Sequence, residues 1–254
     1  MTIFWVSVVS FIAGAINAVA GGGTFLTFPA LTGIAKLTEK VANMTSTIGL
    51  WPGSAASVVA ARTEFRRLPV GMLISFSIIS LCGGGIGAYL LLRTSTEAFR
   101  LVIPWLLAFA TLVFAFSKPI ARWAGRQHGH RSLKWTILVA LVQIVVAIYG
   151  GYFGAGIGVL MLAGLSFAGL DDIHQMNALK VLLATLINAV AAIVFLFYPF
   201  DKSTAAAMAV ASIIGGFLGM AFARRIQPDK LRLLILAIGI ALTGYYFYNA
   251  YKPH

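Results

Sequence analysis

The stretch Asn17–Leu31 reads NAVAGGGTFLTFPAL, and it decides the fold. Three consecutive glycines, Gly21–Gly23, interrupt an apolar run, and Pro29 follows six residues after the last of them. Apolar residues flank the glycines on both sides, so the break lies inside a hydrophobic segment and not in a polar loop. The fold must therefore accommodate a broken backbone inside a membrane.

The composition is that of an integral membrane protein. Of the 254 residues, 60% are hydrophobic and only 10% are charged, whereas a soluble domain carries about 25% charged residues. At about 20 residues per span, this length predicts roughly eight to ten spans. The net charge of +12 comes from residues in short connections between apolar runs. It therefore indicates membrane topology and lipid headgroups, and no nucleic-acid partner is expected.

Ten apolar runs predict an all-α polytopic membrane protein. They cover approximately residues 3–20, 24–35, 41–61, 69–92, 98–117, 135–153, 157–170, 175–199, 203–223 and 231–251. Eight runs are long enough to span as full helices. The other two, 24–35 and 157–170, are short, and each follows a glycine cluster. We therefore expect eight full helices and two short, broken ones.

Sparse matches that keep their order predict two repeats in the chain. Gly21 and Gly23 match Gly154 and Gly156 at an offset of 133, and Asn43 matches Asn177 at an offset of 134. Gly83, Gly84 and Gly87 match Gly215, Gly216 and Gly219 at an offset of 132. The predicted halves are residues 1–117 and 135–254, joined by a basic linker, 118–134. We interpret Gly83-x-x-x-Gly87 and Gly215-x-x-x-Gly219 as helix-packing motifs.

The distribution of Lys and Arg predicts the topology. If each short run crosses the membrane, one side holds thirteen basic residues: Arg62, Arg66, Arg67, Lys118, Arg122, Arg126, Arg131, Lys134, Lys180, Arg224, Arg225, Lys230 and Arg232. The other side holds six: Lys36, Lys40, Arg93, Arg100, Lys202 and Lys252. If the short runs do not cross, the split is nine to ten. The first arrangement obeys the positive-inside rule. It predicts five crossings per half, inverted halves, a cytoplasmic linker and both termini outside.

The paired glycine breaks predict a binding site. A broken helix in hydrocarbon strands backbone N–H and C=O groups, and it is stable only where protein or a water-filled cavity satisfies them. Glycine leaves the N–H groups open to approach, and a helix that starts after the break points its positive end into the site. Two breaks in corresponding places of two repeats indicate a transporter's central site, where we expect them to face each other. Close helix packing is the alternative explanation.

The predicted substrate-binding residues lie at the breaks and in the helices that follow them. They are Gly21, Gly22, Gly23, Thr24, Asn43, Thr45, Ser46, Gly154, Gly156, Asn177, Lys180 and Asn188. Lys180 occupies the repeat position of Ser46 and is the one cation expected inside a helix. It could reach the headgroups by snorkelling, or it could face the interior as the counter-ion of an anionic substrate. The sequence leaves both open.

The sequence offers no sign of catalysis or a cofactor. All seven carboxylates fall at predicted helix ends or loops, and no Walker lysine motif follows the glycines. The only cysteine is Cys82, and His128 and His130 lie in the basic linker, which makes them a weak candidate metal pair. We therefore predict neither an enzyme nor a metal or cofactor site.

Four segments carry a resemblance to a known family. AGAINAVAGGGTFLTFPAL, ANMTSTIGLWPGSAAS, GAGIGVLMLAGL and NALKVLLATLINAVAAIVF resemble the sulfite exporter TauE/SafE-like permeases, over nearly the whole chain. The second copy departs from the pattern, since Gly164 stands near the position of Pro29. The resemblance implies a bacterial or archaeal inner-membrane transporter of sulfite, sulfonates or related small anions.

From these observations we expect a secondary transporter of small organosulfur or carboxylate anions. A passive anion channel of the same fold is the alternative. The expected partners are a small anionic substrate, the lipid bilayer and a coupling ion, either a proton or sodium. A homodimer is left open.

Overall fold

The structure is a computed structural model, and it describes all residues except 67, 126–132, 167–169, 171, 223–227 and 253–254. The described residues form eleven α-helices and no strand. Their bounds are α1 Thr2–Val19, α2 Thr24–Gly33, α3 Glu39–Ala60, α4 Arg62–Phe65, α5 Val70–Arg93, α6 Thr96–Gly125, α7 Leu133–Tyr152, α8 Ile157–Leu165, α9 Ile173–Phe195, α10 Lys202–Ala221 and α11 Pro228–Tyr251.

The expected inventory of helices is confirmed. Eight helices are long, while α2 and α8 are short and each follows a glycine cluster. The sequence analysis missed α4, a four-residue turn after α3. Within the described residues, six helices are long and apolar enough to cross a membrane: α1, α5, α9 and α10, with the stretches Thr96–Phe116 of α6 and Leu233–Tyr251 of α11. Ile137–Tyr152 of α7 is a shorter apolar helix.

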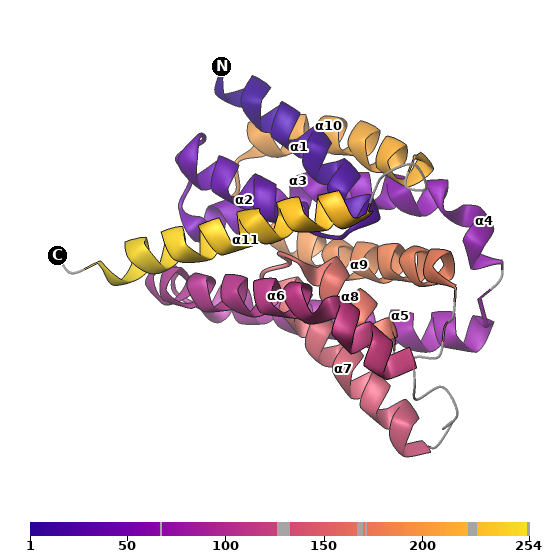
Figure 1. Cartoon of the computed structure of the whole chain (residues 1–254). Helices are drawn as coiled ribbons and strands as arrows, with labels where there is room; N and C mark the ends of the chain where they lie inside the picture. Colours follow the sequence, from indigo (N-terminus) through magenta and orange to yellow (C-terminus); the bar gives the residue numbers. More distant parts are fainter. Residues whose placement is uncertain (67, 126–132, 167–169, 171, 223–227, 253–254) are drawn as a thin grey trace.

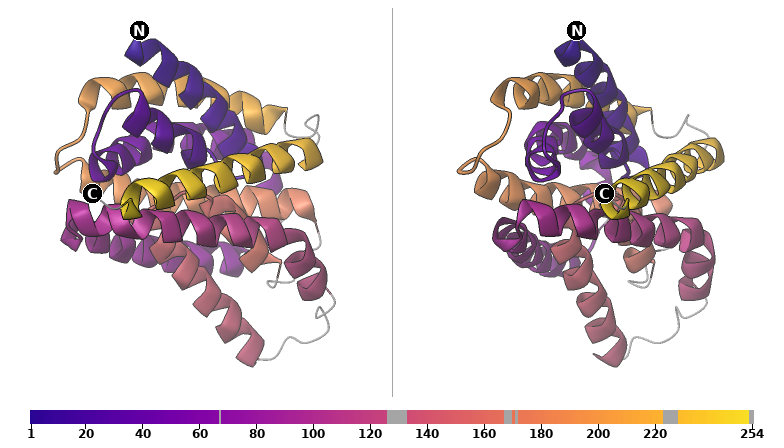
Figure 2. Two further views of the ribbon diagram at one scale, coloured as in Figure 1. Left: turned by 60° about the vertical axis from the view of Figure 1, so that its left-hand side comes forward. Right: turned by 90° about the vertical axis from the view of Figure 1, so that its left-hand side faces the viewer.

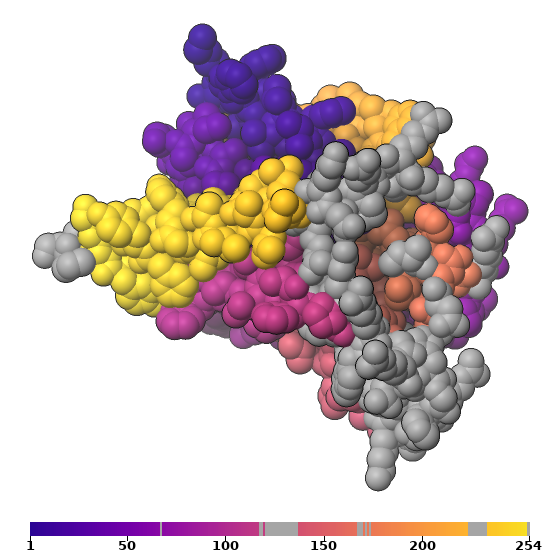
Figure 3. Space-filling view, in the orientation of Figure 1, coloured from indigo at the N-terminus to yellow at the C-terminus, as the bar shows by residue number. Residues whose placement is uncertain are grey.

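The contacts between helices of the first half and the second half occur in matching pairs. Helix α1 packs along α10, and α7 packs along α5. Helix α3 lies against α10, α9 lies against α5, and α3 also contacts α9. Helices α6 and α11 run side by side across one face of the bundle (Figures 1 and 2). Together they cover much of the face shown in space-filling form in Figure 3.

The small-residue motifs bring helix backbones into contact, as predicted. A Cβ added to Gly215 would lie 2.0 Å from the carbonyl oxygen of Phe11 in α1. A Cβ added to Gly87 would lie 2.1 Å from the carbonyl oxygen of Ile148 in α7. Real Cβ contacts are essentially never this short, so only glycine allows the helices to approach this closely. The packing interpretation of both motifs is confirmed.

Three hydrogen bonds place the connections that carry few basic residues at one end of the bundle. Lys40 Nζ donates to the carbonyl of Thr94 at 2.6 Å, and the backbone N–H of Asp201 donates to Thr45 Oγ1 at 3.1 Å. The hydroxyl of Tyr251 donates to the carbonyl of Leu101 at 3.2 Å. Both termini lie toward this end in Figure 1. These connections therefore lie together, as the predicted topology requires of the side with few basic residues, and Lys180, which the prediction counted with the other side, is buried.

Candidate functional site

Glycines in the left-handed backbone conformation separate α1 from α2 and α7 from α8. Gly21 follows α1 with φ +76°, and Gly154 follows α7 with φ +77°. Side chains are disfavoured in this region of backbone conformation. Gly21 donates its N–H to Ile16, and Gly154 donates its N–H to Tyr149, so both helices end in the same way. The next helices begin with Gly23 and Gly156 as N-caps. The prediction that these glycines interrupt the helices is confirmed.

The two breaks touch each other inside the bundle. The N–H of Gly158, in the first turn of α8, donates to the carbonyl oxygen of Gly21 at 3.3 Å. A Cβ on Gly21 would lie 2.3 Å from the Cα of Gly158. The breaks thus face each other, as the repeat pattern predicts. Gly158 itself was absent from the predicted site.

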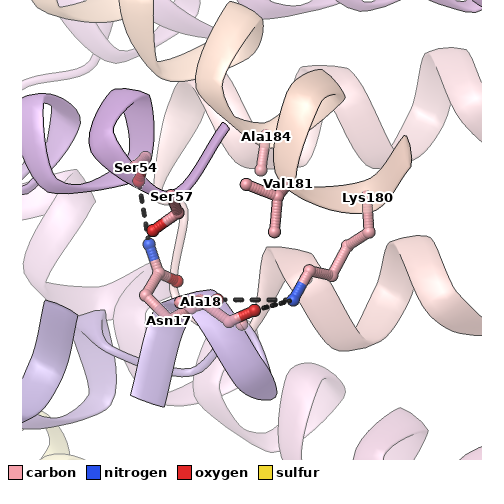
Figure 4. A pocket seen from close by; sticks show the side chains of 9 residues that line it. Asn17, Ala18, Ser54, Ser57, Lys180, Val181 and Ala184 are labelled. Atoms are coloured by element: carbon pink, nitrogen blue, oxygen red, sulfur yellow. Dashed lines mark hydrogen bonds between the residues drawn. The ribbon is translucent and has the colours of Figure 1, made fainter. Parts of the chain in front are cut away.

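Lys180 lies in the interior, beside the end of α1. Its side chain is 1% exposed, which excludes snorkelling to the headgroups. The ammonium donates to the carbonyl oxygens of Ala18 at 3.1 Å and Asn17 at 3.3 Å (Figure 4). It also donates to the carbonyl oxygen of Val19 at 3.4 Å. These carbonyls form the last turn of α1, where a helix carries about half a negative charge. Lys180 therefore caps α1 from α9.

Two asparagines at matching positions reach across to the broken helices of opposite halves. Asn43 Nδ2, in α3, donates to the carbonyl of Tyr152 at the end of α7 at 3.1 Å. Asn177 Nδ2, in α9, donates to the carbonyl of Ala18 near the end of α1 at 3.4 Å. The side-chain oxygen of each asparagine is buried, and no described residue donates to it. Both residues lie at the breaks, as predicted.

The structure brings some of the other predicted residues to the breaks and leaves others apart. Ser46 hydrogen bonds to Thr27 of α2 at 2.7 Å, and Asn188 Oδ1 lies beside Gly154. Thr45 is buried but accepts from the backbone of Asp201, so it stabilises the connection before α10 instead of lining the site. Gly22 faces the side chain of Ile235 in α11.

A small cavity joins Lys180 to the end of α1. Its lining residues are Asn17, Ala18, Gly21, Ser54, Ser57, Gly158, Lys180, Val181 and Ala184 (Figure 4). The cavity measures about 10 Å³, which is the room of one water molecule. At the end of α1, protein groups and not bulk water satisfy the broken backbone in this conformation. The site is closed, and a multi-atom anion requires it to open.

Sequence reasoning missed Ser54 and Ser57 of α3. Ser54 Oγ accepts from Asn17 Nδ2 at 3.1 Å, and Ser57 Oγ donates to the carbonyl of Gly216 at 3.0 Å. Both lie near the face of α3 that carries Ser46, at i+8 and i+11, so helical periodicity offered a signal.

Other predictions fall outside the site. Within the described residues, no three His, Cys, Asp or Glu side chains gather as metal ligands. Cys82 is a free, exposed cysteine of α5. His128 and His130 lie outside the described residues.

Comparison with known proteins agrees with this architecture. Residues 6–246 match the sulfite exporter TauE/SafE family. A protein of Haemophilus influenzae described as a probable membrane transporter protein is 25% identical over 246 residues, which cover 95% of this chain and 92% of that protein. A Sinorhizobium protein described as probable membrane transporter protein ORF9 is 25% identical over 239 residues, covering 93% and 88%. No solved structure matches the chain significantly.

Proposed function

Because this chain belongs to the sulfite exporter TauE/SafE family, and is a multi-pass membrane transporter, we propose that it is a secondary transporter of small organosulfur or carboxylate anions. Sulfite and sulfonates are the proposed substrates, and the inner membrane of a bacterial or archaeal cell is the proposed location. In this proposal the protein moves its substrate across the membrane without changing it chemically.

The observation that carries the proposal is the buried ammonium of Lys180. It lies where the two breaks meet, and its hydrogen-bond partners among the described residues are backbone carbonyls, not carboxylates. A buried charge without a counter-charge is costly. A small anion that enters the cavity would neutralise this charge, and the ammonium would in turn stabilise the anion. The predicted site glycines and the hydroxyls of Ser54 and Ser57 would complete the site.

We propose a second cavity as the start of a route toward this site. It measures about 310 Å³ and is lined by Thr32, Leu37, Glu39, Arg100, Tyr245, Tyr246, Asn249 and Ala250. It lies at the end of the bundle that holds the termini. The rings of Tyr246, Phe28 and Phe153 pack in sequence from this cavity to the second break, with neighbouring centroids 5.4 Å apart. These rings are the proposed gate on that side.

Alternating access would follow from two inverted repeats, residues 1–117 and 135–254, joined by a cytoplasmic linker at 118–134. The recurrent packing of α1 on α10 and of α7 on α5 supports this division. The two broken pairs would rock against each other about the contact of Gly21 with Gly158. Both termini would lie outside the cell.

Counterflow in proteoliposomes tests the proposal. Vesicles loaded with unlabelled sulfite should accumulate labelled sulfite from a dilute external solution, because an alternating-access carrier exchanges substrate. A passive channel, the alternative function, dissipates the gradient and accumulates no label. Parallel runs with sulfoacetate and taurine rank the substrates, and runs with and without a pH gradient detect proton coupling.

A further inference from the structure

The two broken helices end in carbonyls that differ in their partners. At the end of α1, the ammonium of Lys180 donates hydrogen bonds to the carbonyls of Asn17, Ala18 and Val19. The carbonyl of Ala18 also accepts a hydrogen bond from Asn177 Nδ2. A unit positive charge thus sits at the negative end of the helix dipole. The end of α1 is fully capped by groups from α9.

Within the part of the chain that the structure describes, the end of α7 has an amide partner but no cation. The carbonyl of Tyr152 receives Asn43. None of the described residues donates a hydrogen bond to the carbonyls of Gly150 and Gly151. The position that corresponds to Lys180 is Ser46, whose hydroxyl bonds to Thr27. The second helix end therefore carries the same partial charge without the compensating cation.

Oxygen atoms gather at this uncapped end. Two oxygens lie next to Gly154: a Cβ there would have as its nearest neighbours the carbonyl oxygen of Gly150 at 3.2 Å and Asn188 Oδ1 at 3.9 Å. Asn43 donates its side-chain N–H to the same helix end. Asn43 is 1% exposed, and its Oδ1 has no hydrogen-bond partner among the described residues. A buried acceptor without a donor is costly, so these oxygens favour a cation.

We propose that the end of α7 binds a sodium ion, held by the carbonyls of Gly150 and Gly151 and by the amide oxygens of Asn43 and Asn188. These ligands are neutral oxygens, which suit an alkali cation and give no basic group to hold a proton. The sodium ion would compensate the negative end of α7, as the ammonium of Lys180 compensates the negative end of α1. Ends of discontinuous helices bind coupling ions in this way in other transporter folds.

The inference rests on the proposed function, because it makes sodium the coupling ion of the proposed carrier. With sodium at one break and Lys180 at the other, two positive charges flank the contact of Gly21 with Gly158. An anion entering there gains from both, so sodium and substrate binding reinforce each other.

Thermal melting of the purified protein tests the site without any need for transport. We expect the melting temperature to be higher in NaCl than in N-methylglucamine chloride at equal ionic strength, by about 2–4 °C at a saturating concentration. Asn188→Ala should abolish the difference. No difference for the wild type, an equal effect of KCl, or an unchanged difference in Asn188→Ala would overturn the assignment.

A lysine introduced at Ser46, the position equivalent to Lys180, supplies a second test of the sodium site. Ser46→Lys places an ammonium at the position equivalent to Lys180, so its melting temperature should no longer depend on sodium. Ser46→Met, of similar length but uncharged, should be less stable than Ser46→Lys in sodium-free buffer. Equal stability of the two variants in that buffer would contradict the proposal.

Sulfite counterflow in the same proteins separates this inference from the proposed function. A sodium-dependent melting shift without any sulfite transport would contradict the function and support the site. Sulfite transport that is indifferent to sodium would overturn the coupling role and support the function.

Discussion

The backbone N–H of Gly158 donates to the carbonyl of Gly21 at 3.3 Å, across the meeting point of two broken helices that are 137 residues apart in the chain. Neither residue has a side chain, so the two backbones touch directly. The contact joins the break after α1 to the break before α8.

A methyl group at this contact should impair the protein. In Gly158→Ala, the new Cβ would lie 2.4 Å from the Cα of Gly21, and Gly158 is helical, so the change adds no φ strain. Overpacking of this kind costs about 1–3 kcal/mol. We expect a lower melting temperature and reduced sulfite counterflow. Gly85→Ala is the control, because its nearest neighbour would be a side-chain methyl of Val190 at 3.5 Å.

The packing glycines should govern stability. Gly215→Leu would drive a side chain into the backbone of Phe11, which separates α10 from α1. We expect loss of the folded monodisperse protein in detergent, measured by size-exclusion chromatography. The matched change Gly71→Leu meets no atom within 4 Å of the new Cβ and should leave the elution profile intact. Equal profiles for both variants would contradict the packing role.

The topology should follow the basic residues. Reporters fused to either terminus should score outside the cell, and a reporter inserted after Gly125 should score cytoplasmic, because the side with thirteen basic residues stays inside. Opposite scores for the two termini would exclude five crossings per half.

Asp201 should stabilise the start of α10 in a pH-dependent manner. Its carboxylate accepts from the N–H of Thr204 at 3.0 Å and from Ser203 Oγ at 2.8 Å. The backbone hydrogen bond from Thr204 is the main cause that holds the pKa of Asp201 below its usual 3.8. A lowered pKa in the folded state means that the stabilisation is present above that usual value and is lost as the pH falls through the folded pKa.

Asp201→Ala should therefore reduce the free energy of unfolding by about 1 kcal/mol near neutral pH. The difference from the wild type should shrink below about pH 4. Melting curves at several pH values measure both effects, and Asp201→Asn, which keeps a capping acceptor, should retain part of the stabilisation. A difference that does not change with pH would exclude the contribution of the charge.

Much of the fold follows from local patterns in the sequence. Apolar runs of sufficient length predicted the eight long helices, and the glycine clusters predicted where the two short ones begin. Asn43 and Asn177 were identified by their matching positions, and both reach the breaks. These features depend on residue type and spacing, which the sequence contains directly.

Other parts of the site depend on tertiary packing. Lys180 could have pointed to the headgroups or inward, since its position in the helix does not fix which face meets a neighbour. Thr45 and Ser46 are adjacent, about 100° apart around α3, and only Ser46 faces the short helix α2. The role of Gly158 was hidden, because its partner Gly21 belongs to the other half of the chain.

The affinity of the purified protein for sulfite, with Lys180 intact and replaced, tests the central claim most directly. Lys180→Met should weaken binding about 10- to 100-fold, the value of a lost charge-assisted hydrogen bond, and Lys180→Arg should weaken it less. Melting curves of both variants identify losses that come from uncapping α1. An unchanged affinity in a folded Lys180→Met variant would contradict an anion site at this lysine.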